Sequence, residues 1–214
     1  MSIAFTLPPS GALRPNDAKD PLPYYYKPVI GRLYRHRLEM GLSLLPPGGA
    51  RVLEVGVGSG ILVPTLTSHY PEYVGTDLVL APNLERLVTP GCKARFQAAN
   101  LLSQVDLPAG AFDAVVCFSV LEHISEVDAA ATALARSLAP GATLVTGYPM
   151  VNRLMAKAFE AIGYRGIDDD HVSTPSRIEK ALERVLLPVA RRAFPPMAPT
   201  SVALYQCTAW QRRS

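Results

Sequence analysis

The sequence predicts a doubly wound α/β fold: a mostly parallel seven-stranded sheet with an antiparallel C-terminal hairpin and helices on both faces. Two observations carry this prediction. Short apolar runs alternate with helical patterns, which is typical of parallel strands joined by helical crossovers. The last two runs are joined by the short segment Pro195–Pro199, and such a connection favours an antiparallel hairpin. The predicted strands are 51–55, 73–76, 94–96, 112–118, 142–146, 189–194 and 202–209.

The composition is that of an ordinary globular protein, with 214 residues, 49% of them hydrophobic and 18% charged. The net charge is only +3 and the arginines are scattered, so we expect no nucleic-acid partner. The sequence lacks an apolar run of about 18 residues, and its first twenty residues lack the apolar core of a secretory signal. The three cysteines have no CxxC spacing, which favours free thiols in a reducing compartment. We therefore expect a cytoplasmic protein without a membrane span.

The N-terminal segment 1–27 contains five prolines, which predicts an extended arm that ends in the tyrosines 24–26. Apolar residues then recur every three or four positions from Pro28 to Leu45, as in an amphipathic helix, and the prolines and glycines from Pro46 to Gly49 end it. We interpret 28–214 as a single domain, with an N-terminal helix within 28–46.

The remaining helices follow from the same periodicity. Between the strands we predict helices near 61–69, 82–89 and 126–138, the last ended by Pro140-Gly141. Beyond Pro149 we predict helices at 151–163 and 175–187, separated by a polar loop. Residues 150–174 are interpreted as an insertion that forms a lid.

A glycine-rich turn follows the first predicted strand, in Val55-Gly56-Val57-Gly58-Ser59-Gly60. Open α/β sheets bind their ligands at the carboxyl ends of the strands, and glycine lets the backbone approach a ligand there. Glycine turns also occur for packing reasons. A dinucleotide fingerprint needs GxGxxG, whose third glycine would fall on Ile61, so the spacing argues against a nicotinamide cofactor.

The second predicted strand is followed by Asp77. A carboxylate there can accept hydrogen bonds from the two hydroxyls of a ribose. The alternative is that Asp77 caps a helix.

Five blocks in this order resemble the class I, Rossmann-like S-adenosylmethionine-dependent methyltransferases, in particular the small-molecule type 11-like group. The blocks are LEVGVGSG (53–60), VGTDL (74–78), FQAANL (96–101), FDAVVCFSVLEHI (112–124) and LAPGATLVTGYP (138–149).

The resemblance implies that S-adenosylmethionine is the cofactor and S-adenosylhomocysteine the product. It implies that Glu54 and the backbone of Gly56, Gly58 and Gly60 hold the methionine moiety. Asp77 would bind the ribose, and Leu78, Asn100 and Leu101 the adenine; Asn100 replaces an aspartate that is usual in the family. Ser119 lies where the cofactor pocket of the family opens to the substrate.

Direct in-line methyl transfer depends mainly on alignment and exclusion of water, and it needs a general base only if the accepting atom must lose a proton. His123 and His171 are the candidate catalytic residues. Glu122-His123 could instead orient its loop and cap a helix, and His171 could be a solvated loop residue. Some quinone-biosynthesis relatives bind a metal through an acidic residue in this loop. The matching residue here is Ser119, which is not acidic, so we predict no required metal.

The acceptor is predicted to be a small hydrophobic or aromatic molecule, because apolar and aromatic side chains flank the core. They are Tyr24, Tyr25, Tyr26, Met150, Met155 and Phe159. Alternatives are a nicotinamide-dependent oxidoreductase, a non-catalytic S-adenosylmethionine-binding protein and, third, a nucleic-acid methyltransferase. A homodimer is compatible with the sequence.

Overall fold

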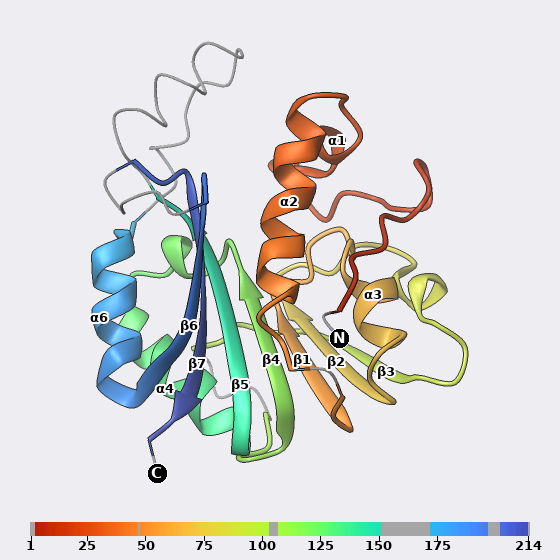
Figure 1. Ribbon diagram of the computed structural model, residues 1–214. Helices are drawn as coiled ribbons and strands as arrows, with labels where there is room; N and C mark the ends of the chain where they lie inside the picture. The colour runs from red at the N-terminus through yellow and green to blue at the C-terminus, as the bar shows by residue number, and fades with distance from the viewer. Residues whose placement is uncertain (1–2, 47, 103–106, 151–171, 197–201, 214) are drawn as a thin grey trace.

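The computed structural model describes residues 3–46, 48–102, 107–150, 172–196 and 202–213. Within these ranges the strands form one seven-stranded sheet in the order β3-β2-β1-β4-β5-β7-β6 (Figure 1). The strands are β1 Arg51–Val55, β2 Glu72–Asp77, β3 Lys93–Ala98, β4 Phe112–Phe118, β5 Leu138–Pro149, β6 Leu186–Phe194 and β7 Tyr205–Arg212. The predicted fold class is confirmed.

The sheet is parallel except at β7. Strand β1 pairs in parallel with β2 and β4, and the pairs β2–β3 and β4–β5 are parallel as well. Strand β7 is antiparallel to both of its neighbours, β5 and β6, so it lies between them. The predicted C-terminal hairpin is thus confirmed, with its second strand inserted inside the sheet. Because the chain passes from β1 to β2 on one side and enters β4 on the other, the carboxyl end of β1 is a topological switch point.

Helices cover both faces of the sheet. They are α1 Leu22–Tyr25, α2 Ile30–Leu42, α3 Val63–Thr67, α4 Val127–Ser137 and α6 Pro175–Val185, with the short 3-10 helices η1 Leu84–Leu87 and η2 Leu121–His123. Figure 1 shows α2 and α3 on one face and α4 and α6 on the other. Successive side chains of β1 point to opposite faces of the sheet. Val52 packs in the core cluster that contains Leu38 and Leu66, and Leu53 packs in the cluster that contains Leu134.

The N-terminal arm departs from the prediction, since residues 22–25 form the short helix α1. A proline is tolerated in the first turn of a helix because the amide it lacks would have no partner there, and Pro23 occupies that position. The rest of the arm is bound to the domain. Ile3 and Leu13 are buried, and the Thr6 amide donates to Oγ1 of Thr65 at 3.0 Å.

Several element boundaries also differ from those predicted. The helix predicted at 82–89 is only η1, which follows Asn83 in a left-handed conformation (φ 65°). Strand β5 begins at Leu138, so Pro140-Gly141 lies inside this strand and not before it. The pairing shifts register there, between Phe112↔Leu138 and Ala114↔Thr143, so the Pro-Gly pair falls in a bulge. Strand β6 begins at Leu186, directly after α6, three residues earlier than predicted.

Candidate active site

A cavity of about 800 Å³ lies at the carboxyl ends of β1, β2 and β4. This volume is within the range of small-molecule sites, about 300–1,000 Å³. The cavity brings together most of the residues that the sequence singled out: Glu54, Gly56, Gly58, Asp77, Leu78, Asn100, Leu101, Ser119 and His123 line it. Gly60 is not among the lining residues, and His171 lies outside the described residues.

The three glycines of the turn have different surroundings, although each has a positive φ. A Cβ on Gly56 would lie 2.2 Å from Cγ2 of Val120, and one on Gly60 would lie 2.6 Å from Cδ2 of Leu84. A Cβ on Gly58 would meet no atom closer than Oδ2 of Asp20, at 3.8 Å. Close packing against Val120 and Leu84 therefore explains why positions 56 and 60 need glycine. No atom packs closely at position 58, so the space beside the Gly58 backbone stays open.

Asp77 joins the end of β2 to the glycine turn. Its Oδ2 accepts a hydrogen bond from the Gly58 amide at 2.7 Å, and its Oδ1 a long one from the Val79 amide at 3.4 Å. The amides of Gly56 and Val57 donate to the Thr76 carbonyl, which fixes the same turn against β2. The alternative that Asp77 caps a helix is wrong, because the next helix, η1, has Asn83 at its N-cap position.

Glu54 is the buried acid of this end of the cavity, with 3% of its surface exposed. The Tyr73 hydroxyl donates a hydrogen bond to its Oε2 at 2.6 Å. Burial raises the pKa of Glu54 to about 8; the Tyr73 hydrogen bond opposes this shift and the neighbouring Asp77 adds to it. Asp20, from the N-terminal arm, also lines the cavity, and burial raises the pKa of its carboxyl as well. The carboxyl groups of three acidic side chains thus line the cavity beside the glycine turn, where they can accept hydrogen bonds from a ligand.

The residues expected near an adenine ring lie beside Asp77. Leu78 is 68% exposed, so its side chain is available to pack against a ligand. Oδ1 of Asn100 accepts the Leu102 amide at 2.9 Å, and a carbonyl oxygen has a second lone pair for another donor.

The cavity is also lined by tyrosines and by one arginine that sequence reasoning missed. Arg37, on α2, donates from Nη2 to the Tyr25 hydroxyl at 2.8 Å. Its guanidinium carbon lies 4.3 Å from the ring centroid of Tyr34 and 5.6 Å from that of Tyr205. A signal was present: position 37 is four residues after Leu33 and three after Tyr34, on the apolar stripe of the predicted helix.

Ser119 lines the same cavity. It follows β4 in a left-handed conformation (φ 55°), which is uncommon for a residue other than glycine. Its amide donates to the Gly147 carbonyl at 2.7 Å, and its Oγ lies 3.0 Å from the Tyr205 hydroxyl. These two contacts, to β5 and to β7, fix the position of Ser119 in the cavity wall.

Glu122 and His123 form η2, and their side chains differ in exposure. Glu122 is 3% exposed, whereas His123 is exposed to solvent. The Glu122 carbonyl accepts hydrogen bonds from the amides of Val172 and Ser173, so this residue does orient the loop before α6. The pair caps no helix, because α4 begins after Glu126.

The Glu122 carboxyl has an unusual environment. Its Oε2 is buried and has no hydrogen-bond partner among the described residues. Burial raises the pKa of Glu122 to about 8, despite the opposing effect of the positive charge of Arg37.

The predicted aromatic pocket is confirmed only in part. Tyr25 lines the cavity, but the hydroxyl of Tyr26 donates to the Pro8 carbonyl at 2.9 Å, and the ring of Tyr24 stacks on Tyr34. Met150 packs in the core cluster that also contains α4 and α6 residues. Met155, Phe159, the helix predicted at 151–163 and most of the predicted lid lie outside the described residues.

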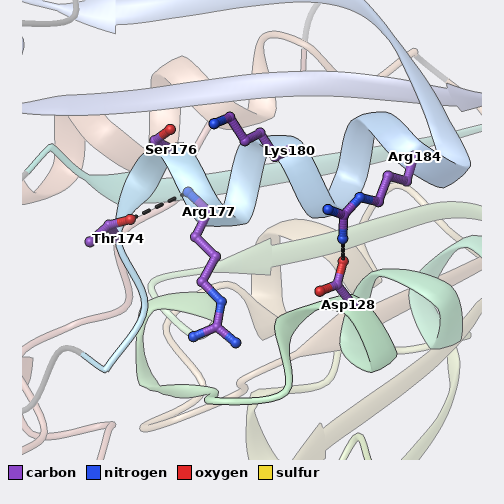
Figure 2. Close-up of a pocket in the computed structure, with 6 residues that line it drawn as sticks. All are labelled: Asp128, Thr174, Ser176, Arg177, Lys180 and Arg184. Carbon is purple, nitrogen blue, oxygen red and sulfur yellow. Dashed lines mark hydrogen bonds and ion pairs between the residues drawn. The ribbon is translucent and has the colours of Figure 1, made fainter.

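A second, smaller hollow lies on the surface of α6 (Figure 2). Its residues are polar or charged: Asp128, Thr174, Ser176, Arg177, Lys180 and Arg184. Arg184 forms an ion pair with Asp128 in which both side chains are more than half exposed, and such pairs contribute little to stability. Thr174 accepts the Arg177 amide and so caps the helix. The two contacts drawn in Figure 2 are thus the N-terminal cap of α6 and an exposed ion pair between α6 and α4.

The described residues contain no helix that is long and apolar enough to cross a membrane. In the same part of the chain, no three or more histidine, cysteine, aspartate or glutamate side chains gather in a way that could hold a metal ion.

Comparison with known proteins identifies the family. A family model described as a methyltransferase domain matches residues 29–186. The chain belongs to this methyltransferase family. The predicted resemblance to the class I methyltransferases is confirmed, and the match covers the cavity except the N-terminal arm and β7.

Among curated proteins, a ubiquinone biosynthesis O-methyltransferase of Xanthomonas axonopodis pv. citri is 34% identical over 113 residues. That alignment covers 50% of this chain and 46% of the relative, so the chain spans about half the length of the curated relatives it matches.

Two solved structures share the fold. The N-methyltransferase NodS from Bradyrhizobium japonicum, in complex with S-adenosyl-L-homocysteine, has a TM-score of 0.63 and 18% identity, and the match covers 94% of this chain and 96% of NodS. The [4+2]-cyclase SpnF has a TM-score of 0.60 and 16% identity, over 86% of this chain and 82% of SpnF.

The glycine surroundings predict different costs for two similar substitutions. Gly58→Ala is expected to lower the free energy of unfolding by about 1–2 kcal/mol, the cost of a left-handed residue with a Cβ. Gly56→Ala adds a collision with Val120 and is expected to cost at least about 1 kcal/mol more. Urea denaturation followed by circular dichroism measures both. Equal losses would contradict the assignment of Gly56 to packing.

The two buried glutamates predict that stability depends on pH. Because burial raises the pKa values of Glu54 and Glu122 to about 8, the folded chain retains their protons at pH values where the unfolded chain releases them. Their contribution to stability is fully present below about pH 4.5 and is lost as the pH rises toward about 8.

We therefore expect the free energy of unfolding to fall between about pH 5 and pH 8, and to fall less in the double variant Glu54→Gln, Glu122→Gln. Urea titrations across this range measure the slope, and Glu183→Gln, on the exposed surface of α6, is the matched control. If the double variant has the wild-type slope, the two glutamates are not the buried titrating groups.

Proposed function

We propose that this chain is an S-adenosylmethionine-dependent methyltransferase that transfers the methyl group directly to a small hydrophobic or aromatic acceptor. The observation that carries the proposal is a single cavity that is lined both by the glycine turn with Glu54 and Asp77 and by the tyrosines Tyr25, Tyr34 and Tyr205. Membership of the methyltransferase family supports the same reaction.

The part of the cavity beside the glycine turn fits the cofactor chemically. When bound, S-adenosylmethionine supplies an electrophilic methyl group on a positively charged sulfur, and its methionine part carries an ammonium group. The Asp77 carboxylate favours such charges, the carboxyl groups of Asp20 and Glu54 can accept hydrogen bonds from the ammonium group, and the space beside Gly58 allows a close approach to the backbone. We assign Asp77 to the ribose hydroxyls and Leu78, Asn100 and Leu101 to the adenine. The complex of NodS with S-adenosyl-L-homocysteine supports this cofactor.

The protein's own part in the reaction is mainly alignment. Ser119, fixed by Gly147 and Tyr205, is the residue that we place where acceptor and cofactor would meet, and we assign the tyrosines of the cavity to the exclusion of water from the acceptor. His123 is the group we assign to accept a proton when the accepting atom must lose one. The role of His171 stays a prediction. The name of the Xanthomonas relative supports oxygen as the accepting atom.

Two alternatives to the proposed function are an oxidoreductase and a cofactor-binding protein without methyltransferase activity. The third glycine of the turn falls at Gly60, one position too early for a dinucleotide fingerprint, which argues against a nicotinamide-dependent oxidoreductase. The cyclase SpnF has this fold, so the fold by itself does not establish methyl transfer, and a cofactor-binding protein without this activity stays an alternative.

If two copies of the chain pair, we infer that the edge strand β6 is the shared surface. It lies at one end of the sheet, and its Leu187 and Val189 are about half exposed, at 44% and 51%.

Calorimetric titration tests the proposed cofactor. We expect S-adenosylmethionine and S-adenosylhomocysteine to bind with micromolar dissociation constants, and Asp77→Ala to weaken both by roughly tenfold or more. Asp128→Ala, on the exposed surface of α4, is the matched control and should leave both constants unchanged. NAD serves as the competing ligand. Binding of NAD in place of the sulfur compounds, or of neither, would overturn the proposal.

A further inference from the structure

A loop of the N-terminal arm forms part of the cavity wall. This arm loop comprises residues 15–21, and its side chains that line the cavity are Asn16, Asp17, Lys19, Asp20 and Pro21. The same cavity is lined by Gly58, Asp77 and Leu78, where the proposed function places the nucleoside. The family match begins at residue 29, so the arm loop is an addition to the part of the chain that the family model describes.

Buried side chains hold the arm on both sides of the arm loop. Leu13 precedes the loop and Leu22 follows it, and both belong to the core cluster that also contains Leu62. No residue of the loop itself is buried. Pro15 and Pro21 restrict the backbone where the loop begins and ends. The arm loop is therefore a segment with fixed ends and little apolar contact, and such segments open at a low cost in free energy.

Hydrogen bonds within the arm loop make it a compact unit. The Asp20 carboxyl accepts the Asn16 amide at Oδ2, at 3.1 Å, and the Leu22 amide at Oδ1, at 2.8 Å. Oδ1 of Asp17 accepts the Lys19 amide at 2.7 Å. These three bonds do not involve the rest of the domain, so the loop can move away from the cavity without losing them.

Two further contacts connect the arm loop to the ends of β1 and β2. The side-chain amide of Asn16 donates to the Val79 carbonyl, just after β2, at 3.1 Å, and this hydrogen bond is exposed to solvent. The Asp20 carboxyl is hydrogen-bonded to the side chain of Ser59, in the glycine turn after β1. Both contacts must break before the loop can leave the cavity.

We propose that the arm loop is a gate for the cofactor, latched by Asn16, which must release Val79 before S-adenosylmethionine can enter or S-adenosylhomocysteine can leave. This inference rests on the proposed function, because it takes the nucleoside to lie between the arm loop and the ends of β1 and β2. Such a gate slows exchange in both directions and excludes water from the bound cofactor. Opening of the gate then limits the rate at which product is released.

The rate constants for binding of S-adenosylhomocysteine test the gate. Surface plasmon resonance with the full chain immobilised gives the association and dissociation rate constants separately. We expect Asn16→Ala to raise both by about threefold to tenfold, because it removes one hydrogen bond of the closed gate. Asn16→Leu keeps the bulk of the side chain but lacks the same donor, so it should raise both rate constants as well.

The matched control is Arg14→Ala, in the same arm. The Arg14 side chain also donates hydrogen bonds, but to the carbonyls of Gly11 and Leu13, within the arm, and it does not line the cavity. Both rate constants should therefore keep their wild-type values in this variant. Circular dichroism verifies that each variant is folded.

The outcomes distinguish the gate from the proposed function. Unchanged rate constants in the folded Asn16 variants, or an equal acceleration in Arg14→Ala, would overturn the gate, whereas binding of S-adenosylhomocysteine would still support the proposed function. A rise in the dissociation rate constant alone would also overturn the gate, because Asn16 would then be a contact of the bound ligand and not a latch. A wild-type chain that does not bind S-adenosylhomocysteine would overturn the proposed function and the gate with it.

Discussion

The hydrogen bond from the Gly58 amide to the Asp77 carboxylate, 2.7 Å long, joins the two strand ends on which the site depends. Strand β1 ends in the glycine turn and β2 ends at Asp77, and their register places Val55 beside Thr76. Because the Thr76 carbonyl also accepts the amides of Gly56 and Val57, the turn has one conformation relative to the sheet. Both strands are parallel and end at the same edge of the sheet. The backbone of the glycine turn and the Asp77 carboxylate can therefore face one ligand.

Ionisable groups of both kinds line the cavity at this edge. Carboxyl groups come from the arm and from β1 and β2, and a guanidinium comes from α2, among tyrosine rings. Burial raises the pKa of both Glu54 and Glu122 to about 8, so at neutral pH these two acids are mainly uncharged.

Much of this was predictable from the sequence, for local reasons. Strand and helix periodicity depends on neighbouring residues, so it predicted the sheet and the two helical faces, and the glycine turn and Asp77 lie in blocks that are continuous in sequence. The errors have tertiary causes. Helix α1 forms despite Pro23 because this proline occupies its first turn, and Leu138 starts β5 because it pairs with Phe112 across a bulge. Arg37 looked like an ordinary helix residue, since its surroundings depend on β7 and Tyr205 reaching the same cavity.

The most direct test is a crystal structure of the chain with S-adenosylhomocysteine. We predict that the ribose lies at Asp77, the adenine beside Leu78 and Asn100, and the sulfur near Ser119. A nucleoside whose ribose is bound away from Asp77 would contradict the joint role of the β1 and β2 ends on which the proposed site depends.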